Sequence, residues 1–156
     1  TAIGKFPINV VKTLNQVINE TEEATSLVRD SFPEDVSKTA DAISHAVCSI
    51  SLDLDIKVIM TMTHSGSTAR MISRYRPDAK IFALTPFNKI VRELQIVWGV
   101  NPIKVDNYDN VEAIPNLCFS VLKEFKLLKE GEKFVITGGV PMGTEGTTNY
   151  LSVQEL

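Results

Sequence analysis

The chain has 156 residues, which suits one compact domain with a substantial core that needs no disulfide or structural metal. Its 16 basic and 19 acidic residues give a net charge of −3 without charged blocks, which argues against an electrostatic surface for nucleic acid. No apolar stretch approaches the roughly 20 residues that a membrane-spanning helix needs, and we find no signal-peptide pattern. We therefore expect neither a nucleic-acid partner nor a membrane partner.

The two cysteines bear on the cellular compartment. Cys48 and Cys118 lie far apart in the sequence, and neither belongs to a C-x-x-C motif or lies near a histidine cluster. This cysteine usage predicts two reduced, buried thiols in a cytoplasmic protein, and it gives no support to a metal site.

Two helices are predicted before the first strand. Apolar residues recur at helical spacing between Pro7 and about Val28, which indicates a long amphipathic helix. The segment 31–34 is typical of a break followed by a capping-box start, so a second helix is expected after it. The apolar stripe of the second helix consists of Val36, Ala40, Ile43, Val47 and Ile50.

A hydroxyl-rich loop follows the first predicted strand, the apolar run 56–60, and leads into a short helix that Pro77 ends. The loop consists of Thr63, His64, Ser65, Gly66, Ser67 and Thr68. A strand that turns into a helix directs free backbone N–H groups at an anion over the helix end. The hydroxyls would add donors, and Gly66 would let the backbone approach a ligand closely. The alternative is that Ser and Thr only cap the helix.

Strands and helices continue to alternate after this loop. Residues 81–84 and 100–105 are predicted strands, and Asn88 is predicted to cap the helix between them, which Gly99 closes. The segment 109–125 has a helical pattern in which Pro115 leaves two alternatives. The helix begins near Ile114 with proline in its first turn, or it begins at Asp109 and bends at the proline.

Two strands without an intervening helix are predicted at the end of the chain, at 134–136 and 150–153, with the glycine-rich segment 138–148 between them. We expect these two to be antiparallel neighbours, whereas strands that are joined by helices should run parallel. The sequence thus predicts a three-layer α/β/α domain with a mixed, mostly parallel five-stranded sheet whose last strand is antiparallel.

The hydroxyl-rich loop and the glycine-rich segment are expected to face one crevice, because ligands of open α/β sheets bind beyond the carboxyl ends of the strands. The second segment supplies Gly143, Thr144, Gly146 and Thr147, which would close over a phosphorylated ligand; a mobile hairpin loop is the alternative. Neither segment contains G-x-x-x-x-G-K-[ST] or G-x-G-x-x-G, which disfavours ATP hydrolysis and dinucleotide chemistry.

The side chains near this crevice indicate binding and no catalysis. His64 lacks an obvious catalytic partner and Ser65 is not in a G-x-S-x-G elbow, so His64 is interpreted as a binding or solvent-facing residue. Arg70 and Arg74 could supply charge to an anion, although such residues more often form weak surface ion pairs. Trp98 is interpreted as a packing residue.

Four segments in order along the chain resemble the C-terminal domain of pyruvate kinases, and the last of them looks most like bacterial members. They are TAIGKFP at 1–7, THSGSTAR with SRYRP at 63–77, WGV with Pro102, and GVPMGTEGTTN at 139–149. The resemblance implies that residues 1–28 match the final helix of the (β/α)₈ barrel domain and that residues 29–156 match the regulatory domain. It places the effector phosphate loop on Thr63–Thr68 and the flexible effector loop on the 139–148 region.

The resemblance also implies a function, as the regulatory part of the enzyme that makes pyruvate and ATP from phosphoenolpyruvate and ADP. The family's catalytic residues and its Mg²⁺ and K⁺ sites lie in the barrel, so no catalytic residue, metal ligand or cofactor is assigned to this chain, which is expected to be inactive alone. The implied partners are a phosphorylated effector, the rest of pyruvate kinase and further copies in a homo-oligomer.

The identity of the effector and the role of the domain each leave alternatives. Segment 138–148 has no arginine for a second phosphate, so a sugar monophosphate or AMP is as plausible as fructose 1,6-bisphosphate. An oligomerisation module of the same fold that binds no ligand is the alternative function. A small independent enzyme is disfavoured because no acid, base or nucleophile constellation is present.

Overall fold

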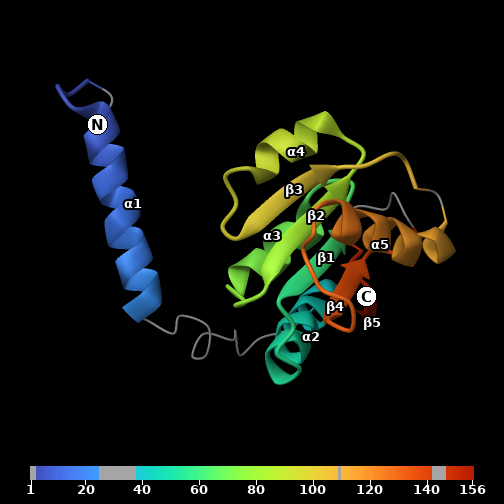
Figure 1. The fold of residues 1–156 in the computed structure, drawn as a ribbon. Helices are drawn as coiled ribbons and strands as arrows, with labels where there is room; N and C mark the ends of the chain where they lie inside the picture. Colours follow the sequence, from blue (N-terminus) through green and yellow to red (C-terminus); the bar gives the residue numbers. More distant parts are fainter. Residues whose placement is uncertain (1–2, 25–37, 109, 142–146) are drawn as a thin grey trace. The chain divides into compact units, whose positions relative to one another are not determined.

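The computed structural model of the chain describes residues 3–24, 38–108, 110–141 and 147–156, and it divides into two compact units, Thr1–Ser31 and Phe32–Leu156 (Figure 1). The described residues of the first unit contain the helix α1 (Pro7–Ala24). The helix predicted from Pro7 is therefore confirmed as far as Ala24, and its predicted remainder lies outside the described residues. Taken by itself, α1 has an exposed apolar stripe, as Leu14 at 51% illustrates.

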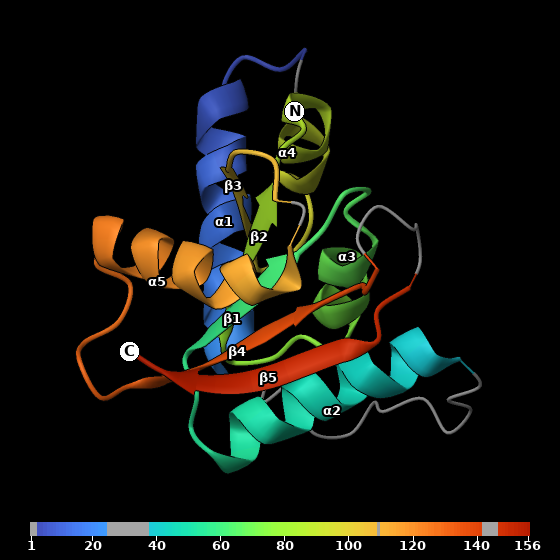
Figure 2. The same ribbon diagram turned by 90° about the vertical axis from the view of Figure 1, so that its right-hand side faces the viewer.

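The second unit contains a five-stranded sheet with the strand order β3-β2-β1-β4-β5, in which β1 to β4 run parallel and β5 is antiparallel to β4. The strands are β1 (Val58–Met62), β2 (Lys80–Thr85), β3 (Val100–Lys104), β4 (Lys133–Gly138) and β5 (Tyr150–Glu155). Figure 2 shows β4 and β5 running side by side with no helix between them. This confirms the predicted fold class, including the antiparallel last strand.

Helices cover both faces of the sheet. On one face pack α2 (Thr39–Asp53), α3 (Ser67–Arg74) and α4 (Asn88–Leu94), and on the other packs α5 (Ile114–Glu124), which follows the 3₁₀ turn η1 (Val111–Ala113). Successive side chains of a strand point to opposite faces, so Ile59 belongs to the core under α2, α3 and α4, while Val58 and Met60 belong to the core under α5. Both cores are needed because parallel strands bury both faces.

The inner face of α2 carries small polar residues as well as apolar ones. Its buried residues are Ala40, Ser44, Val47, Cys48 and Ser51, a spacing of three and four that places them on one side of the helix. Ser44 Oγ donates to the Ala40 carbonyl at 2.7 Å and Ser51 Oγ donates to the Cys48 carbonyl at 2.8 Å. The buried hydroxyls are thereby satisfied within the helix, at little cost to burial.

Both ends of α4 differ from the predictions, and the alternative at Pro115 is settled. Helix α2 begins at Thr39 after an extended Lys38, and the predicted capping-box start at 31–34 lies outside the described residues. Asn88 is the first residue of α4, and Phe87 is its N-cap. Helix α4 ends at Leu94, so Gly99, at φ +67°, turns the chain into β3 and does not close the helix. Pro115 lies in the first turn of α5, where its missing N–H costs nothing.

Both cysteines are buried and free, as the sequence predicted. Burial raises the pKa of the Cys48 thiol and that of the Cys118 thiol to about 12, because a thiolate would lose its hydration inside the two cores. Across the described ranges, no helix is both long and apolar enough to cross a membrane.

A pair of leucine substitutions tests the difference in side-chain burial between the apolar stripe of α1 and the core of the sheet domain. Leu122→Ala in α5 removes a side chain with 0% exposure and should lower the free energy of unfolding by about 2–5 kcal/mol. Leu14→Ala in α1 should change it by less than about 0.5 kcal/mol. Urea unfolding followed by the fluorescence of Trp98 would measure both, and equal losses in the two variants would contradict the exposure of the α1 stripe.

Candidate functional site

The order of the strands places a topological switch point at the carboxyl ends of β1 and β4. From β1 the chain crosses by α3 to β2 on one side, while β4, on the other side of β1, is reached from β3 by α5 on the opposite face. The connections therefore diverge between β1 and β4, and ligands of open α/β sheets bind at such a divergence. The two predicted loops follow these same two strands.

The first loop leads from the carboxyl end of β1 into α3, whose N-terminal end has no side-chain cap. Thr63 fixes the loop, because its N–H donates to the Leu84 carbonyl at 3.0 Å and its Oγ1 accepts the Gly66 N–H at 2.8 Å. Gly66 is the N-cap of α3, and no side chain caps the helix. The hydroxyls of Ser65 and Ser67, which are half-buried, are therefore not used as helix caps.

Gly66 is required for a reason different from the expected close approach to a ligand. Its φ of +80° lies in the left-handed region, which favours glycine. A Cβ at this position would lie 3.1 Å from Leu94 Cδ2 and 3.4 Å from Ile90 Cγ2, so it would point at α4. The loop thus packs against the inner side of α4, and a substitution of Gly66 disturbs folding before it disturbs a ligand.

The second loop is joined to the first by a pair of threonine hydroxyls. Thr68 Oγ1, in the first turn of α3, lies 2.8 Å from Thr148 Oγ1, and the two side chains are 5% and 1% exposed. Thr147, next to Thr148, is half-buried. Gly143, Thr144 and Gly146, the other predicted residues of this loop, lie outside the described residues.

The stem of the second loop is held closed by Asn149. Its side-chain Oδ1 accepts the Val140 N–H at 2.7 Å, and its Nδ2 donates to the Val140 carbonyl at 2.6 Å. Its own N–H donates to the Gly138 carbonyl at 3.0 Å. A Cβ on Gly139 would lie 2.1 Å from the Thr147 carbonyl oxygen, so only glycine fits between the two sides of the stem.

His64 is packed between two aromatic rings. Its ring centroid lies 5.6 Å from that of Phe87 and 5.4 Å from that of Tyr108. Tyr108 is buried and its hydroxyl donates to the Leu84 carbonyl at 3.3 Å, and burial raises the pKa of this phenol. His64 is thus half-buried, and its role in binding a ligand stays a prediction.

The sequence analysis did not identify Phe87, Tyr108 and Asn149 as part of the site, and it included Thr148 only within segment 138–148. The sequence signal of Phe87 was its position two residues after the end of β2, and that of Asn149 was its position directly before β5. A search for polar and aromatic residues at the carboxyl end of each predicted parallel strand would have included Phe87.

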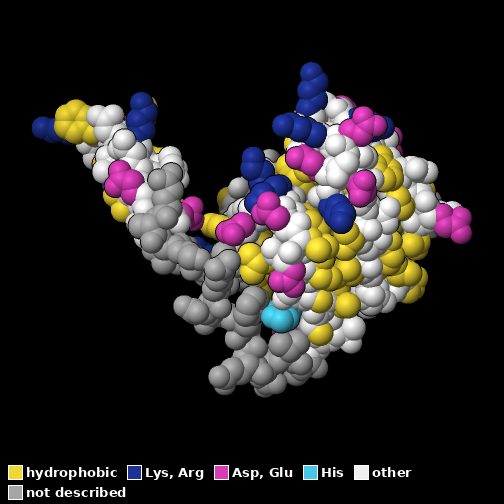
Figure 3. Space-filling view, turned by 60° about the horizontal axis from the view of Figure 1, so that its bottom comes forward, with side chains coloured by type: hydrophobic (Ala, Val, Ile, Leu, Met, Phe, Trp, Pro, Cys, Tyr) yellow, Lys and Arg dark blue, Asp and Glu magenta, His cyan; other side chains and the backbone are white. Residues whose placement is uncertain are grey.

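Charged residues near the first loop are paired with carboxylates. Arg70 Nη2 lies 3.2 Å from Glu93 Oε2, and Arg74 Nη2 lies 3.5 Å from Asp41 Oδ1. Basic and acidic side chains are interspersed over the face seen in Figure 3, which agrees with the unblocked charge of the sequence. In the parts of the chain that the structure describes, no group of three or more His, Cys, Asp or Glu side chains could hold a metal ion.

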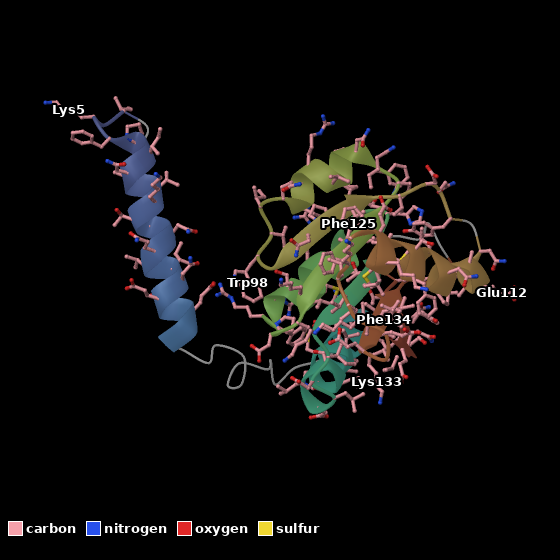
Figure 4. All side chains as sticks on the ribbon, in the orientation of Figure 1. Lys5, Trp98, Glu112, Phe125, Lys133 and Phe134 are labelled. Carbon is pink, nitrogen blue, oxygen red and sulfur yellow. The ribbon has the colours of Figure 1, made fainter. Side chains whose placement is uncertain are left out.

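Trp98, interpreted from the sequence as a packing residue, lies partly exposed at the turn before β3 (Figure 4). Its side chain is 36% exposed, and the Arg76 guanidinium lies over its ring at 5.2 Å from the centroid. The Trp98 carbonyl accepts the Ser73 hydroxyl at 2.6 Å, which ties this turn to α3.

Comparison with known proteins identifies the family. Residues 41–154 match the family model described as pyruvate kinase, alpha/beta domain. The chain belongs to this family. It is 36% identical over 156 residues to a pyruvate kinase of Staphylococcus epidermidis, and this alignment covers 98% of the present chain and 27% of the relative. It is 34% identical over 157 residues to one of Clostridium acetobutylicum, which covers 99% of this chain and 33% of the relative.

Solved structures of the same family have the same fold. A crystal structure of a pyruvate kinase from Cryptosporidium parvum superposes with a TM-score of 0.79 at 26% identity and covers 97% of this chain and 31% of that chain. The chain thus spans about a third or less of the pyruvate kinases that it matches. The sequence alignments include α1 as well as the sheet domain, since they cover 98% or more of the chain.

A double-mutant cycle on Thr68 and Thr148 tests the junction between the two loops. Thr68→Val and Thr148→Val should each cost about 1–3 kcal/mol of stability, because each leaves a buried hydroxyl without its partner. The double variant should cost less than the sum of the two single changes. Urea unfolding of the four proteins measures the coupling, and strictly additive losses would show that the two hydroxyls do not interact.

Proposed function

We propose that this chain is the C-terminal regulatory part of a pyruvate kinase and that it binds a phosphorylated effector between its two loops. The observation that supports this most is the Thr68–Thr148 contact, which joins the loop after β1 to the loop after β4 at the divergence of the sheet connections. Open α/β sheets bind their ligands at this position, beyond the carboxyl ends of the strands where the connections diverge.

The first loop suits a phosphate. The N-terminal end of a helix carries free N–H groups and the positive end of the helix dipole, and both favour an anion. The N-cap of α3 is Gly66, which has no side chain, so the backbone N–H groups in the first turn of α3 are available to a ligand. Ser65 and Ser67 supply hydroxyls beside it, and Thr144 and Thr147 are the proposed donors from the second loop.

The remaining parts of the proposal rest on membership of the pyruvate kinase family. We assign residues 1–28 to the end of the barrel domain and residues 29–156 to the regulatory domain of a cytoplasmic, oligomeric glycolytic enzyme. In the whole enzyme, phosphoryl transfer from phosphoenolpyruvate to ADP takes place in the barrel, where Mg²⁺ and K⁺ are bound. Our proposal for this chain is regulation and subunit contact, without catalysis of its own.

Ligand-induced stabilisation tests the effector site. Fructose 1,6-bisphosphate, ribose 5-phosphate, glucose 6-phosphate and AMP are each added to the chain, and at least one should raise the melting temperature. Binding to the native state alone adds roughly 2.7 kcal/mol of stability at 100 times Kd. The Ser65→Ala/Ser67→Ala variant should reduce the rise, because two donors to the phosphate are lost.

Matched controls separate binding from folding. Ser120→Ala removes an exposed hydroxyl that bonds only within α5, to the Asn116 carbonyl at 2.9 Å, and it should leave the ligand effect unchanged. The unphosphorylated sugar or nucleoside is the ligand control. If none of the four phosphates stabilises the chain more than inorganic phosphate does, the effector-site proposal fails.

A second candidate function, self-association without a ligand, is favoured by the edges of the sheet. The edge strand β3 contains Pro102, which has no N–H and disfavours pairing with another strand, whereas β5 at the opposite edge contains no proline. The exposed stripe of α1 adds apolar surface that favours association.

Light scattering across a wide range of concentration tests this function. The expected mass exceeds the 17.2 kDa of one chain at high concentration, because β5 can pair with a second copy. The variant Leu14→Glu/Ile18→Glu separates association through α1 from association through the sheet, and it should leave the sheet contribution intact. A mass of one chain at every concentration would eliminate this candidate.

A further inference from the structure

The register of β4 and β5 changes at the end of the pair. Gly138 is the last residue of β4 and lies opposite Tyr150, the first residue of β5 (Figure 2). The Gly138 carbonyl nevertheless accepts the N–H of Asn149, one residue earlier in the chain, at 3.0 Å. Gly138 thus faces two successive residues, as in a β-bulge. The residues that lead into β5 are therefore shifted by one position relative to the register of the two strands.

The side-chain amide of Asn149 takes the place of the next main-chain pair. In the register of the two strands, Val140 would lie opposite Thr148. The Leu156 N–H donates to the Glu132 carbonyl at 3.0 Å, which marks their pair as hydrogen-bonded. Such pairs alternate along antiparallel strands, so Val140 and Thr148, an even number of residues further along, would exchange both main-chain bonds. Instead, Asn149 Oδ1 accepts the Val140 N–H and Asn149 Nδ2 donates to the Val140 carbonyl. This two-bond contact is the Asn149 clasp.

The shift of one residue decides which face of the sheet Thr148 meets. Side chains alternate along a strand, and Tyr150 packs on the α5 side of the sheet while Leu151 packs on the side of α2, α3 and α4. A continued ladder would therefore turn the Thr148 side chain to the α5 side. In the structure, Thr148 Oγ1 lies 2.8 Å from Thr68 Oγ1 of α3, on the opposite side. A slip of one residue reverses the faces of a strand, which accounts for this contact.

Gly139 permits the shifted course of the chain. A Cβ on Gly139 would lie 2.1 Å from the Thr147 carbonyl oxygen, so the main chain of Thr147 crosses directly over this residue. The φ of Gly139 does not lie in the left-handed region, in contrast to those of Gly66 and Gly99. The crossing, and not the backbone conformation, therefore requires glycine at this position.

We propose that Asn149 is the positioning residue of a register device with two states. In the observed state, the Asn149 clasp holds Val140, and the Thr148 hydroxyl lies on Thr68. In the second state, Thr148 pairs with Val140 through the main chain, β4 and β5 gain one pair, and the Thr68 hydroxyl loses its partner. Both states satisfy the N–H and the carbonyl of Val140, so they differ little in main-chain hydrogen bonding. The device goes beyond the function proposed above, because it joins or separates the two loops without a ligand.

Amide hydrogen exchange of Asn149→Ala, measured by NMR on the 156-residue chain, tests the proposal. Without the side-chain amide, Val140 takes its partners from Thr148, so the Thr148 N–H should exchange at least about tenfold more slowly than in the parent. If Asn149 only held the stem together, its loss would make exchange at Thr148 faster. Asn149→Asp should behave like Asn149→Ala at neutral pH, because a carboxylate accepts the Val140 N–H but cannot donate to the Val140 carbonyl.

Gly139→Ala is the second variant, and it leaves Asn149 in place. The added Cβ excludes the Thr147 carbonyl from its crossing and favours the second state, so exchange of the Thr148 N–H should again be slower. The matched control is Asn101→Ala, which removes an exposed asparagine side chain from β3, at the opposite edge of the sheet. This control should leave exchange at Thr148 within about twofold of the parent.

The coupling between Thr68 and Thr148 gives an independent measurement. In the parent, the effect of Thr148→Val on the unfolding equilibrium constant should depend on whether residue 68 is threonine or valine. In the Asn149→Ala background, the effect should be the same, within about twofold, with either residue at position 68. Slower exchange at Thr148 in Asn149→Ala and Gly139→Ala, together with loss of this coupling, supports the register device. Faster or unchanged exchange at Thr148 in either variant, or a coupling that persists in Asn149→Ala, overturns it.

Discussion

The arrangement of this domain depends on the burial of β1 on both faces. All five residues of β1 are buried, and the strand has a parallel neighbour on each side. A central strand of this kind requires helices on both faces, so the connection by α3 and the connection by α5 lie on opposite sides of the sheet. The two connections diverge beyond Met62, at the carboxyl end of β1.

Threonine side chains occupy the positions at which the buried strands end and the loops begin. Where the buried strands end, side chains must be small enough to pack and polar enough to satisfy the backbone of the loops. Thr63 accepts the Gly66 N–H, Thr137 donates to the Tyr150 carbonyl at 2.8 Å, and Thr68 pairs with Thr148. Among the described residues, Thr61 Oγ1 is the one buried side-chain polar atom without a partner. Thr61 lies in β1, two residues before Thr63, which follows the end of the strand.

The sequence was sufficient to predict the sheet, because apolar runs bounded by glycine, proline and helical patterns leave few alternatives. The antiparallel last strand was predictable because 138–148 is too short and too rich in glycine for a crossover helix. The end of α4 was not predictable. Gly99 has the left-handed conformation that ends helices, but the helix stops at Leu94, whose side chain packs under Gly66 from a distant loop.

The candidate site was predictable only in its local part. The loop Thr63–Thr68 was identified because its residues are contiguous and its chemistry is local. The contact of His64 with Phe87 and Tyr108 depends on which strands are neighbours, which a single sequence does not specify residue by residue. The partner of Thr68 could not be found for the same reason, since Thr148 is 80 residues away.

The 80-residue separation between Thr68 and Thr148 affects when their contact can form during synthesis of the chain. Thr148 lies 80 residues after Thr68, and the central strand β1 also needs β4 as a neighbour, so the hydroxyl junction cannot form until both β4 and Thr148 have been synthesised. Contacts over long sequence distances form late, because loop closure must precede them. During translation, the nascent chain therefore has helix α3 and its loop long before it has the junction between the two loops.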